Sequence, residues 1–405
     1  EVVIAIARPD PERRRAIVDR CMDAGVQVRS IPPVRDWIGG KLQPGQIREI
    51  RIEDLLGRAV IEIDQEQVRE TLTGRLVLVS GAAGSIGSEL VRQLVRFELR
   101  GLILLDLAES ALYDLHMELL GAQVRVPLTV LVGDVRDRPS MTRLFEHHRP
   151  DVVFHAAAYK HVPMMEDTPG EALRTNVGGT LVLADLAVAY QVQRFILVST
   201  DKAVNPTSVM GMSKRIAERY VQGAARKGRT VFVTTRFGNV LGSSGSVVPL
   251  FRGQIARGGP VTVTHPEVTR YFMTIPEACR LVLEAAAMGN GGEIFVFDMG
   301  SPVKIKDLAE RMIRLSGHRP GVDIEVTFTG LRHGEKLYEE LLADAELTER
   351  THHPRILIGK VDDPPSPTLM SSIEALVRDV PLAEKAGLLE RMRELVPEYQ
   401  GAPSS

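Results

Sequence analysis

Short apolar runs alternate with amphipathic stretches between residues 66 and 200 of the chain. An apolar run bounded by polar residues predicts a buried strand, whereas apolar residues three and four positions apart predict a helix that covers the strands. The predicted strands are 75–80, 101–106, 128–133, 151–155 and 194–199, and the predicted helices are 84–97, 110–120, 140–148 and 171–190. This alternation predicts an α/β fold with a doubly wound parallel sheet.

The alternation is interrupted on both sides of this central part. Near the N-terminus the pattern predicts a strand at 2–7, a helix at 10–24 and a strand at 26–31, followed by a Pro/Gly-interrupted loop at 32–45. Beyond the centre, a Gly/Ser-rich stretch precedes a predicted strand at 261–264 and a helix that runs toward Met288. A last helix is predicted at 382–396. The predicted segments are a partial N-terminal α/β unit (1–65), a main α/β domain (66–236), a smaller α/β lobe (237–345) and a C-terminal packing segment (346–405).

Composition narrows the class of protein. The 405 residues are 44% apolar and 25% charged, as in an ordinary globular chain. A net charge of −2 gives no support for nucleic acid or a membrane surface as the main partner. The two cysteines, Cys21 and Cys279, are far apart and have no metal-ligand spacing, so neither a disulfide framework nor a metal site is expected. A reducing compartment, the cytoplasm, follows.

No apolar run is long enough to cross a bilayer, and no signal peptide opens the chain. The sequence begins at Glu1, without Met, directly in the strand-like VVIAIA. We therefore expect it to be part of a longer protein.

Three glycines with the spacing G-x-x-G-x-x-G follow the strand at 75–80 and open the next helix. Glycines here allow a tight turn and let the backbone approach a pyrophosphate at the helix N-terminus. Asp106 ends the next strand about twenty residues later, where a carboxylate accepts hydrogen bonds from ribose hydroxyls and repels a 2′-phosphate. Together Gly81, Gly84, Gly87 and Asp106 predict a Rossmann-type dinucleotide site that prefers NAD to NADP.

The stretch 195–214 carries the candidate chemistry. A strand ends in Thr200-Asp201-Lys202, and ligands of parallel sheets bind beyond the carboxyl ends of strands. Met210 and Lys214 follow, four positions apart and so on one face of a helix. Their spacing is that of the Tyr-x-x-x-Lys pair of short-chain dehydrogenases/reductases, with Met in place of Tyr. The alternative interpretation is a strand-turn-helix with ordinary surface polar residues.

These motifs together resemble the extended short-chain dehydrogenases/reductases, and specifically the nucleotide-sugar 4,6-dehydratases of bacterial surface-polysaccharide and glycan biosynthesis. The subgroup that the sequence resembles carries Met instead of Tyr and acts on UDP-N-acetylglucosamine. The resemblance covers about residues 66–345. It implies an NAD(P)-binding main domain, a substrate-binding lobe at 237–345, and an N-terminal nucleotide-binding-like unit with a structural or regulatory role.

Elimination across C5 and C6 of a 4-keto sugar needs a base for the C5 proton and an acid for the departing 6-hydroxyl. The resemblance assigns the acid to Asp201 and the base to Lys202. To act as a base, Lys202 needs a lowered pKa, which we expect from burial or from neighbouring Lys214. Met210 has no proton to exchange, so Thr200 or Asp201 is expected to take the 4-hydroxyl proton. Lys214 is expected to bind the nicotinamide ribose. The predicted catalytic set is therefore Thr200, Asp201, Lys202, Met210 and Lys214.

The resemblance also implies two sets of binding residues. The predicted cofactor-binding residues are Gly81, Ala83, Gly84, Ser85, Ile86, Gly87, Asp106, Asp134, Val135, Ala156, Ala157, Ala158 and Lys214. The predicted substrate-binding residues are Lys160, Asn176, Asn239, Val248, Arg270, Arg332 and Glu335. Two positions have alternatives: Asp134 could cap a helix before Arg136, and His155 is expected to be a packing residue rather than a base.

The predicted function is 4,6-dehydration of a UDP-N-acetylhexosamine to a UDP-4-keto-6-deoxy sugar. A UDP-hexosamine 4-epimerase, which needs no elimination pair, is the first alternative, and a non-catalytic dinucleotide sensor is the second. The expected partners are a UDP-sugar and further copies of the chain, in a homo-oligomer. The resemblance also implies a parent protein anchored in the inner membrane by a segment upstream of this sequence, with the present part facing the cytoplasm.

Overall fold

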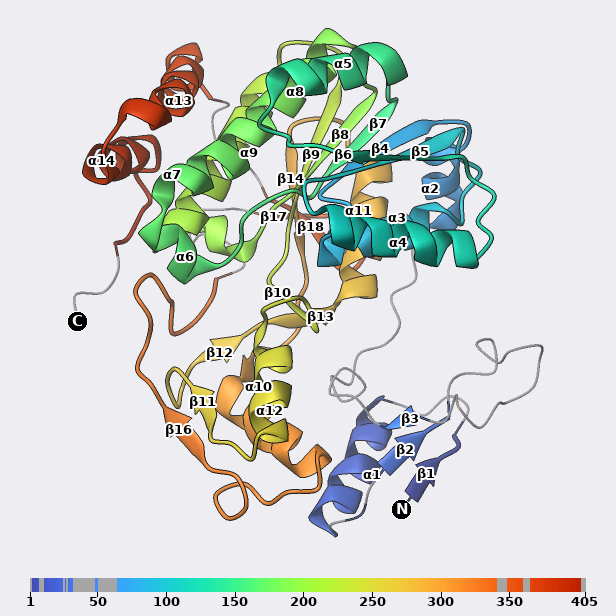
Figure 1. Ribbon diagram of the computed structural model, residues 1–405, viewed down its shortest axis with the longest axis vertical. Coiled ribbons are helices and arrows are strands. Elements are labelled where there is room, and N and C mark those ends of the chain that lie inside the picture. Colours follow the sequence, from blue (N-terminus) through green and yellow to red (C-terminus); the bar gives the residue numbers. More distant parts are fainter. Residues whose placement is uncertain are drawn as a thin grey trace. The chain divides into compact units, whose positions relative to one another are not determined.

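The computed structural model describes residues 2–6, 11–24, 26, 28–31, 48–49, 64–340, 348–359 and 365–401. The chain divides into two compact units that are both discontinuous in sequence. The larger comprises residues 62–239, 275–300 and 332–405, and the smaller comprises residues 1–61, 240–274 and 301–331. The loop predicted at 32–45 lies outside the described residues. Figure 1 labels the elements of both units.

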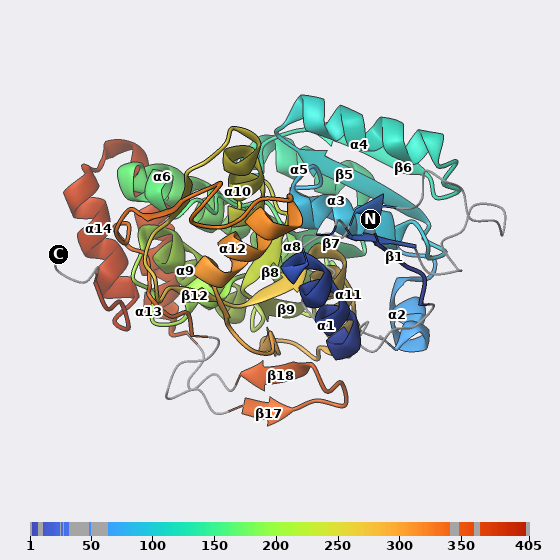
Figure 2. The ribbon, with the colours of Figure 1, turned by 90° about the horizontal axis from the view of Figure 1, so that it is seen from below.

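A nine-stranded sheet forms the centre of the larger unit (Figure 1). In spatial order its strands are β17 (Thr348–Arg350), β18 (Ile356–Gly359), β14 (Glu293–Phe297), β9 (Val231–Arg236), β8 (Arg194–Val198), β7 (Val152–His155), β4 (Leu76–Ser80), β5 (Gly101–Asp106) and β6 (Leu128–Val132). From β6 to β14 all neighbours are parallel, whereas β18 pairs antiparallel with both β14 and β17. Figure 2 shows β17 and β18 side by side. The strand order reverses between β4 and β7, where open α/β sheets bind ligands.

Helices cover both faces of this sheet (Figure 1). One layer contains α2 (Gln65–Leu72), α3 (Ser85–Leu94), α4 (Glu109–Gly121) and α11 (Ile275–Met288), and the other contains α5 (Arg138–His148), α8 (Thr180–Ala189) and α9 (Val209–Ala224). Between β7 and α8 lie α6 (Val162–Asp167), α7 (Pro169–Ala172) and the π-helix η5 (Leu173–Gly179). The strands and the helix faces that meet them are apolar, which makes a buried core on both sides of the sheet.

Two C-terminal helices add a further layer over α9. They are α13 (Pro367–Asp379) and α14 (Lys385–Leu395), joined by the 3₁₀ turn η7 (Val380–Leu382), and both pack against α9 (Figures 1 and 2). Gly223 of α9 makes room for α13, since a Cβ atom there would lie 2.2 Å from the sulfur of Met370. Leu376 and Met392 are buried in the same core as α9. The C-terminal segment is therefore part of the folded core of this unit.

The smaller unit contains short strands and three helices within its described residues. Its N-terminal part has β1 (Val2–Ile4), α1 (Pro11–Asp23), β2 (Val28–Ser30) and β3 (Arg48–Glu49). Its other parts have β10 (Asn239–Leu241), α10 (Val247–Ala256), β11 (Val261–Val263), β12 (Thr269–Arg270), β13 (Phe272–Thr274), β15 (Val303–Lys304), α12 (Ile305–Leu315) and β16 (Val326–Phe328). β10 pairs with β13, β11 with β16, and β12 with β15.

The structure confirms the predicted α/β fold with a doubly wound, mainly parallel sheet, and it differs from the prediction in places. The helix predicted at 171–190 is a short α-helix, a π-helix and a second α-helix. Within the π-helix, Gly178 and Gly179 lie where a Cβ atom would come within 3.1 Å of Val377 and 2.7 Å of Val135. The helix toward Met288, α11, packs against α2 and α3. The four consecutive domain ranges remain a prediction. Among the described helices, none has the length and apolarity needed to cross a membrane.

Candidate active site

The loop between β4 and α3 is too tightly packed for side chains at two of its three glycines. Gly81 has a φ of +73°, and a Cβ atom there would lie 2.5 Å from the backbone nitrogen of Ala157. A Cβ atom on Gly87 would lie 1.9 Å from the carbonyl oxygen of Gly81. Backbone therefore lies so close at both positions that a side chain would not fit, which is what glycine permits.

Helix α3 begins directly after this loop, with Ser85 and Ile86 in its first turn. The N-cap residue is Gly84, which has no side chain with which to cap the helix. The backbone N–H groups at such a helix start attract phosphate. Asp106 lies beside the loop, because its Oδ2 accepts a hydrogen bond of 2.8 Å from the backbone N–H of Ala83. A tight glycine loop, a helix N-terminus and a strand-end carboxylate together fit a dinucleotide.

Three alanines, Ala156–Ala158, continue from β7 next to the glycine loop. The backbone N–H of Ala156 donates to the carbonyl oxygen of Ser80 over 2.9 Å, and Ala157 is the residue that a Cβ on Gly81 would meet. These alanines thus lie beside the glycine loop, and their contact with a cofactor stays a prediction.

Asp134 forms an ion pair rather than a helix cap. Its Oδ2 lies 2.7 Å from Nη2 of Arg136, which also contacts Glu171 at 2.8 Å. Burial would raise the pKa of Asp134, but the hydrogen bonds and charge of Arg136 outweigh it and lower that pKa. The N-cap of α5 is Asp137, so the helix-cap alternative for Asp134 is wrong. Val135 is buried in the hydrophobic core, and contact of either residue with the adenine end of a cofactor stays a prediction.

His155 is a buried, neutral packing residue, as its strand-end position predicts. Its Nδ1 lies 2.8 Å from Oγ of Ser80 and its Nε2 lies 3.0 Å from Oγ1 of Thr180. Because the Thr180 hydroxyl donates to the carbonyl oxygen of Asn176, it accepts from His155, which assigns the proton to Nε2. Burial, with a smaller contribution from Lys214, lowers the pKa of His155 to about 3.

Asn176 orders the segment that follows the alanines. Its Oδ1 accepts a hydrogen bond from the backbone N–H of Tyr159, and its Nδ2 donates to the carbonyl oxygen of Tyr159, at 2.8 and 2.9 Å. The same Nδ2 lies 2.9 Å from Oγ of Ser213 on α9. Asn176 is fully buried, whereas the adjacent Lys160 is exposed. A positioning role for Asn176 fits this geometry, and direct contact of Asn176 or Lys160 with substrate stays a prediction.

The residues after β8 form a cluster of one ammonium and two carboxylates. In the 3₁₀ turn η6 (Asp201–Ala203), Nζ of Lys202 lies 3.1 Å from Oδ1 of Asp201. On its other side Nζ lies 3.2 Å from Oε1 of Glu339, and it donates to Oδ1 of Asn239 over 3.4 Å. The Thr200 hydroxyl donates to Oδ1 of Asp201 over 2.9 Å. The structure therefore brings the predicted Thr200, Asp201, Lys202 and Asn239 together.

Asp201 is the most buried member of this cluster, with 1% of the residue exposed. Burial raises the pKa of Asp201, the charge of Lys202 lowers it, and the charge of Glu339 raises it again, so that the net direction is upward. Its Oδ2 has no hydrogen-bond partner among the described residues. That oxygen faces Gly238, where a Cβ atom would lie only 2.7 Å away. A buried carboxyl with a raised pKa is suited to keeping a proton for use as an acid.

The two residues predicted on helix α9 have different surroundings. Nζ of Lys214 donates to the carbonyl oxygen of Val198 over 2.7 Å, and burial lowers the pKa of Lys214 to about 8 although Glu218 opposes the change. Lys202 forms ion pairs with two carboxylates, and the expected influence of Lys214 on Lys202 stays a prediction. Met210 is 3% exposed and packs in the hydrophobic core, as the packing interpretation of a thioether predicts.

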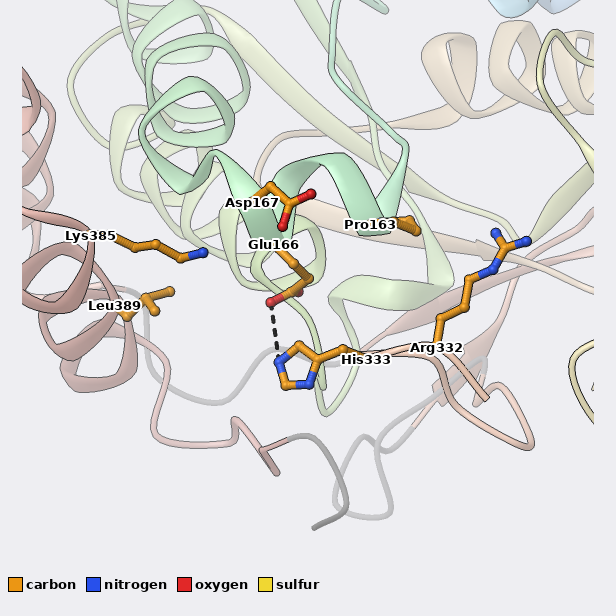
Figure 3. Close-up of a pocket in the computed structure, with 7 residues that line it drawn as sticks. All are labelled: Pro163, Glu166, Asp167, Arg332, His333, Lys385 and Leu389. Carbon is orange, nitrogen blue, oxygen red and sulfur yellow. Dashed lines mark ion pairs between the residues drawn. The ribbon is translucent and has the colours of Figure 1, made fainter. Parts of the chain in front are cut away.

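Arg332 lies at the surface and lines a cavity of about 380 Å³ (Figure 3). The other residues around the cavity are Pro163, Glu166 and Asp167 of α6, His333, and Lys385 and Leu389 of α14. Nε2 of His333 lies 3.6 Å from Oε2 of Glu166, the pair joined by the dashed line in Figure 3. Glu335 accepts a hydrogen bond from the backbone N–H of Arg332 over 3.2 Å. This cavity is not lined by Asp201 or Lys202.

Other candidate donors have structural contacts. Arg236, at the start of the Gly/Ser-rich stretch, is fully buried in an ion pair with Glu218. Val248 and Arg270 belong to the smaller unit. There Val248 is 1% exposed, and Arg270 donates to the carbonyl oxygen of Thr269 over 2.7 Å. Their role in substrate binding stays a prediction.

Sequence reasoning missed two members of the site, Glu339 and Gly238. Glu339 is one of several acids in the run 335–340, and nothing in that pattern distinguishes the one that contacts Lys202. Gly238 lies in the Gly/Ser-rich stretch, where a glycine also predicts an ordinary loop. The available signal was the position of Glu339 within a stretch that the resemblance already assigns to substrate binding.

Comparisons with known proteins agree with this geometry. A family model described as "Polysaccharide biosynthesis protein" matches residues 77–361. The capsular polysaccharide biosynthesis protein CapD of Staphylococcus aureus is 45% identical over 382 residues, which are 94% of this chain and 63% of that protein. A UDP-glucose 4-epimerase of Rickettsia rickettsii is 38% identical over 284 residues, or 68% of this chain and 80% of that protein. The X-ray structure of Pen from Bacillus thuringiensis matches with a TM-score of 0.66 and 31% identity, covering 73% of this chain and 90% of that one.

The present chain thus spans less than two thirds of the length of CapD. The family model covers the glycine loop, the Asp201–Lys202 pair and Glu339. The resemblance predicted from the motifs is confirmed at this level. The chain belongs to the polysaccharide biosynthesis protein family, within the extended short-chain dehydrogenases/reductases.

Proposed function

We propose that this chain catalyses the NAD-dependent 4,6-dehydration of a UDP-N-acetylhexosamine, with UDP-N-acetylglucosamine as the substrate. The product is a UDP-4-keto-6-deoxy sugar for surface polysaccharide or glycan biosynthesis. The observation that carries the proposal is the contact of 3.1 Å between Lys202 and buried Asp201 at the carboxyl end of β8. An acid and a base held side by side are what an elimination needs, and reactions at C4 alone do not require such a pair.

The acid and base roles follow from the surroundings of the two residues. The raised pKa of Asp201 favours the protonated form of its carboxyl group, which protonates the departing 6-hydroxyl. Lys202 takes the proton from C5 and returns it to C5 after water has left. At the elimination step Lys202 is neutral and Asp201 is protonated, and Asp201 has gained its proton in the preceding oxidation at C4.

The contact between Thr200 and Asp201 supports a route for the 4-hydroxyl proton. The Thr200 hydroxyl donates to Asp201, so Thr200 passes the proton of the sugar 4-hydroxyl to that carboxylate. Asp201 then delivers a proton to the 6-hydroxyl, and the two steps leave its protonation unchanged. In sum, the 4-hydroxyl proton and the 6-hydroxyl leave together as water.

A bound nicotinamide dinucleotide would supply the hydride chemistry, as the acceptor from C4 and the donor to C6. Gly81, Gly87, the start of α3 and Asp106 would hold this cofactor, and Lys214 would contact its ribose. The carboxylate of Asp106 supports NAD rather than NADP, because it repels a 2′-phosphate.

The test is incubation of the purified chain with NAD and UDP-N-acetylglucosamine that carries deuterium at C4, followed by mass spectrometry and proton NMR. The dehydratase loses one water and moves the deuterium from C4 to C6. In a parallel reaction in deuterated water with unlabelled substrate, deuterium enters at C5. UDP-glucose is the control for the acetamido group. Absence of turnover with bound NAD would contradict the proposal and favour a dinucleotide sensor.

A UDP-hexosamine 4-epimerase is the second candidate, and the 38% identical epimerase relative supports it. An epimerase returns the hydride to C4, so the label in this experiment would stay at C4 and no water would be lost. The contact between Asp201 and Lys202 argues against an epimerase, because epimerisation at C4 needs no elimination pair. The same experiment therefore separates the two candidates by the position of one deuterium atom.

Within a cell we propose that this chain faces the cytoplasm, as part of a longer protein anchored in the inner membrane, and that it forms a homo-oligomer. The greater length of CapD supports a longer parent protein. Membrane fractionation of the full-length protein and light scattering on the present chain test the two points separately.

A further inference from the structure

We propose that Glu339 is a positioning residue for the acid-base pair, which holds the amine of Lys202 against Asp201 and stabilises the ammonium that forms during elimination. This inference rests on the proposed dehydration, and it assigns a role to a residue far from the pair in sequence.

The first support is geometric. Oε1 of Glu339 lies 3.2 Å from Nζ of Lys202, and Oδ1 of Asp201 lies 3.1 Å from the same atom. Both carboxylate side chains are buried, with 3% and 0% exposed, whereas 21% of the Lys202 side chain remains exposed. The amine is thus held by two fixed acceptors while it keeps access to a substrate.

The second support is electrostatic. A lysine that takes a proton from C5 becomes positively charged, and a fixed carboxylate at 3.2 Å stabilises that charge without reorganisation. The negative charge of Glu339 also disfavours ionisation of Asp201, which helps to keep the acid protonated. The charges that act on Asp201 are those of Lys202 and Glu339, and Glu339 also contacts Lys202, so one carboxylate favours the protonated form of both reacting groups.

The adjacent Glu340 provides a matched control. Its Oε2 accepts a hydrogen bond of 2.7 Å from Nδ2 of Asn205, and its Oε1 lies 3.5 Å from Nζ of Lys336. It is a neighbouring acid of the same segment with different partners. A general loosening of the segment would affect both positions, whereas the proposed role belongs to Glu339 alone.

The experiment measures kcat, KM and their pH profiles for dehydration of UDP-N-acetylglucosamine by the wild type, Glu339→Gln, Glu339→Asp and Glu340→Gln. For Glu339→Gln we expect kcat to fall at least about tenfold with KM nearly unchanged, because the lost interaction strengthens only as charge develops. Removing a negative neighbour favours proton loss from both groups, so both limbs of the bell-shaped profile should move to lower pH. Glu339→Asp keeps the negative charge, so the two limbs of its pH profile should stay at the wild-type pH although kcat is lower.

A second readout does not depend on turnover. Acetylation of Lys202 by acetic anhydride, followed across pH by peptide mass spectrometry, reports the protonation of its amine. The midpoint should be lower in Glu339→Gln than in the wild type and unchanged in Glu340→Gln. If Glu339→Gln changes neither the acetylation midpoint nor the pH profile while the wild type dehydrates the sugar, the role of Glu339 is overturned and the proposed function is kept. If the wild type does not dehydrate the sugar but the midpoint is still lower in Glu339→Gln, the proposed function is overturned and the contact between Glu339 and Lys202 is kept.

Discussion

Glu218 of α9 and Arg236 of β9 form a bidentate ion pair inside the protein. Nη2 of Arg236 lies 2.7 Å from Oε2 of Glu218, and Nε donates to Oε1 over 2.9 Å. Ser199, at the end of β8 next to the catalytic turn, also donates to Oε1 of Glu218 over 2.6 Å. The pair thus ties α9, β8 and β9 together directly behind Thr200 and Asp201.

Replacing only one partner of this ion pair should destabilise the fold strongly. Burial would raise the pKa of Glu218, but Arg236 keeps it low, so Arg236→Met leaves a buried carboxylate without its main partner. We expect a loss of about 3–5 kcal/mol, measured by urea unfolding followed by circular dichroism. The double variant Glu218→Met/Arg236→Met should be less destabilised than Arg236→Met, because it removes the buried carboxylate that in Arg236→Met keeps Arg215 and Ser199 but loses its bidentate partner. Equal losses in the two variants would contradict this account.

Acid should destabilise the protein through His155. The pKa of His155 is lowered from 6.5 to about 3 on folding, so the unfolded chain binds the proton more tightly than the folded one. The stability that the neutral ring contributes is present above pH 6.5 and is lost progressively as the pH falls from there toward 3. Between pH 7 and pH 5 this loss should be about 2 kcal/mol. His155→Gln should therefore show a pH dependence of unfolding that is smaller by that amount, and an unchanged dependence would refute the buried neutral state.

The glycine loop should not tolerate even a methyl group at its most crowded position. A Cβ atom on Gly87 would lie 1.9 Å from the carbonyl oxygen of Gly81, so Gly87→Ala must displace the loop. We expect at least tenfold weaker NAD binding by calorimetry, together with a lower thermal midpoint. Gly121→Ala is the control, since a Cβ atom there meets no other atom within 4 Å. NAD affinity that survives Gly87→Ala would place the cofactor elsewhere.

The cofactor preference should depend on the charge of Asp106. Asp106→Asn keeps an acceptor for the N–H of Ala83 but removes the charge that repels a 2′-phosphate. The ratio of the NADP to the NAD dissociation constant should fall about tenfold, which titration with the two cofactors measures. A constant ratio would show that another part of the site selects the cofactor.

The parallel sheet could be predicted because each of its central strands is a local apolar run with a polar residue at its end. β5, for example, has the predicted bounds, Gly101–Asp106, and its last residue is the predicted cofactor selector. The π-helix at Leu173–Gly179 could not be predicted, because its residues also have the pattern of an α-helix. Its irregular geometry depends on contacts of its glycines with distant side chains.

In the candidate site, too, the residues with a local sequence pattern could be predicted and the residue that arrives from a distant segment could not. Thr200, Asp201 and Lys202 are adjacent in sequence, so a strand end was enough to predict that they act together. Glu339 joins them from 137 positions beyond Lys202, through a fold that returns a late segment to the end of β8. Such a contact has no local signature, and only the three-dimensional structure identifies it.

Removing the amine of Lys202 should separate elimination from oxidation. In Lys202→Met no base takes the C5 proton, so dehydration should fall by about two to four orders of magnitude. Thr200 and Asp201 remain, so oxidation at C4 should continue and reduced nicotinamide should accumulate, visible by its absorbance. In deuterated water the recovered sugar should carry no deuterium at C5. Because the substitution leaves Asp201 and Glu339 without their shared cation, the thermal midpoint is measured alongside activity, and Lys227→Met at the surface is the control. Deuterium at C5 in a folded Lys202→Met variant would show that another residue is the base and that Lys202 serves only to hold the two carboxylates.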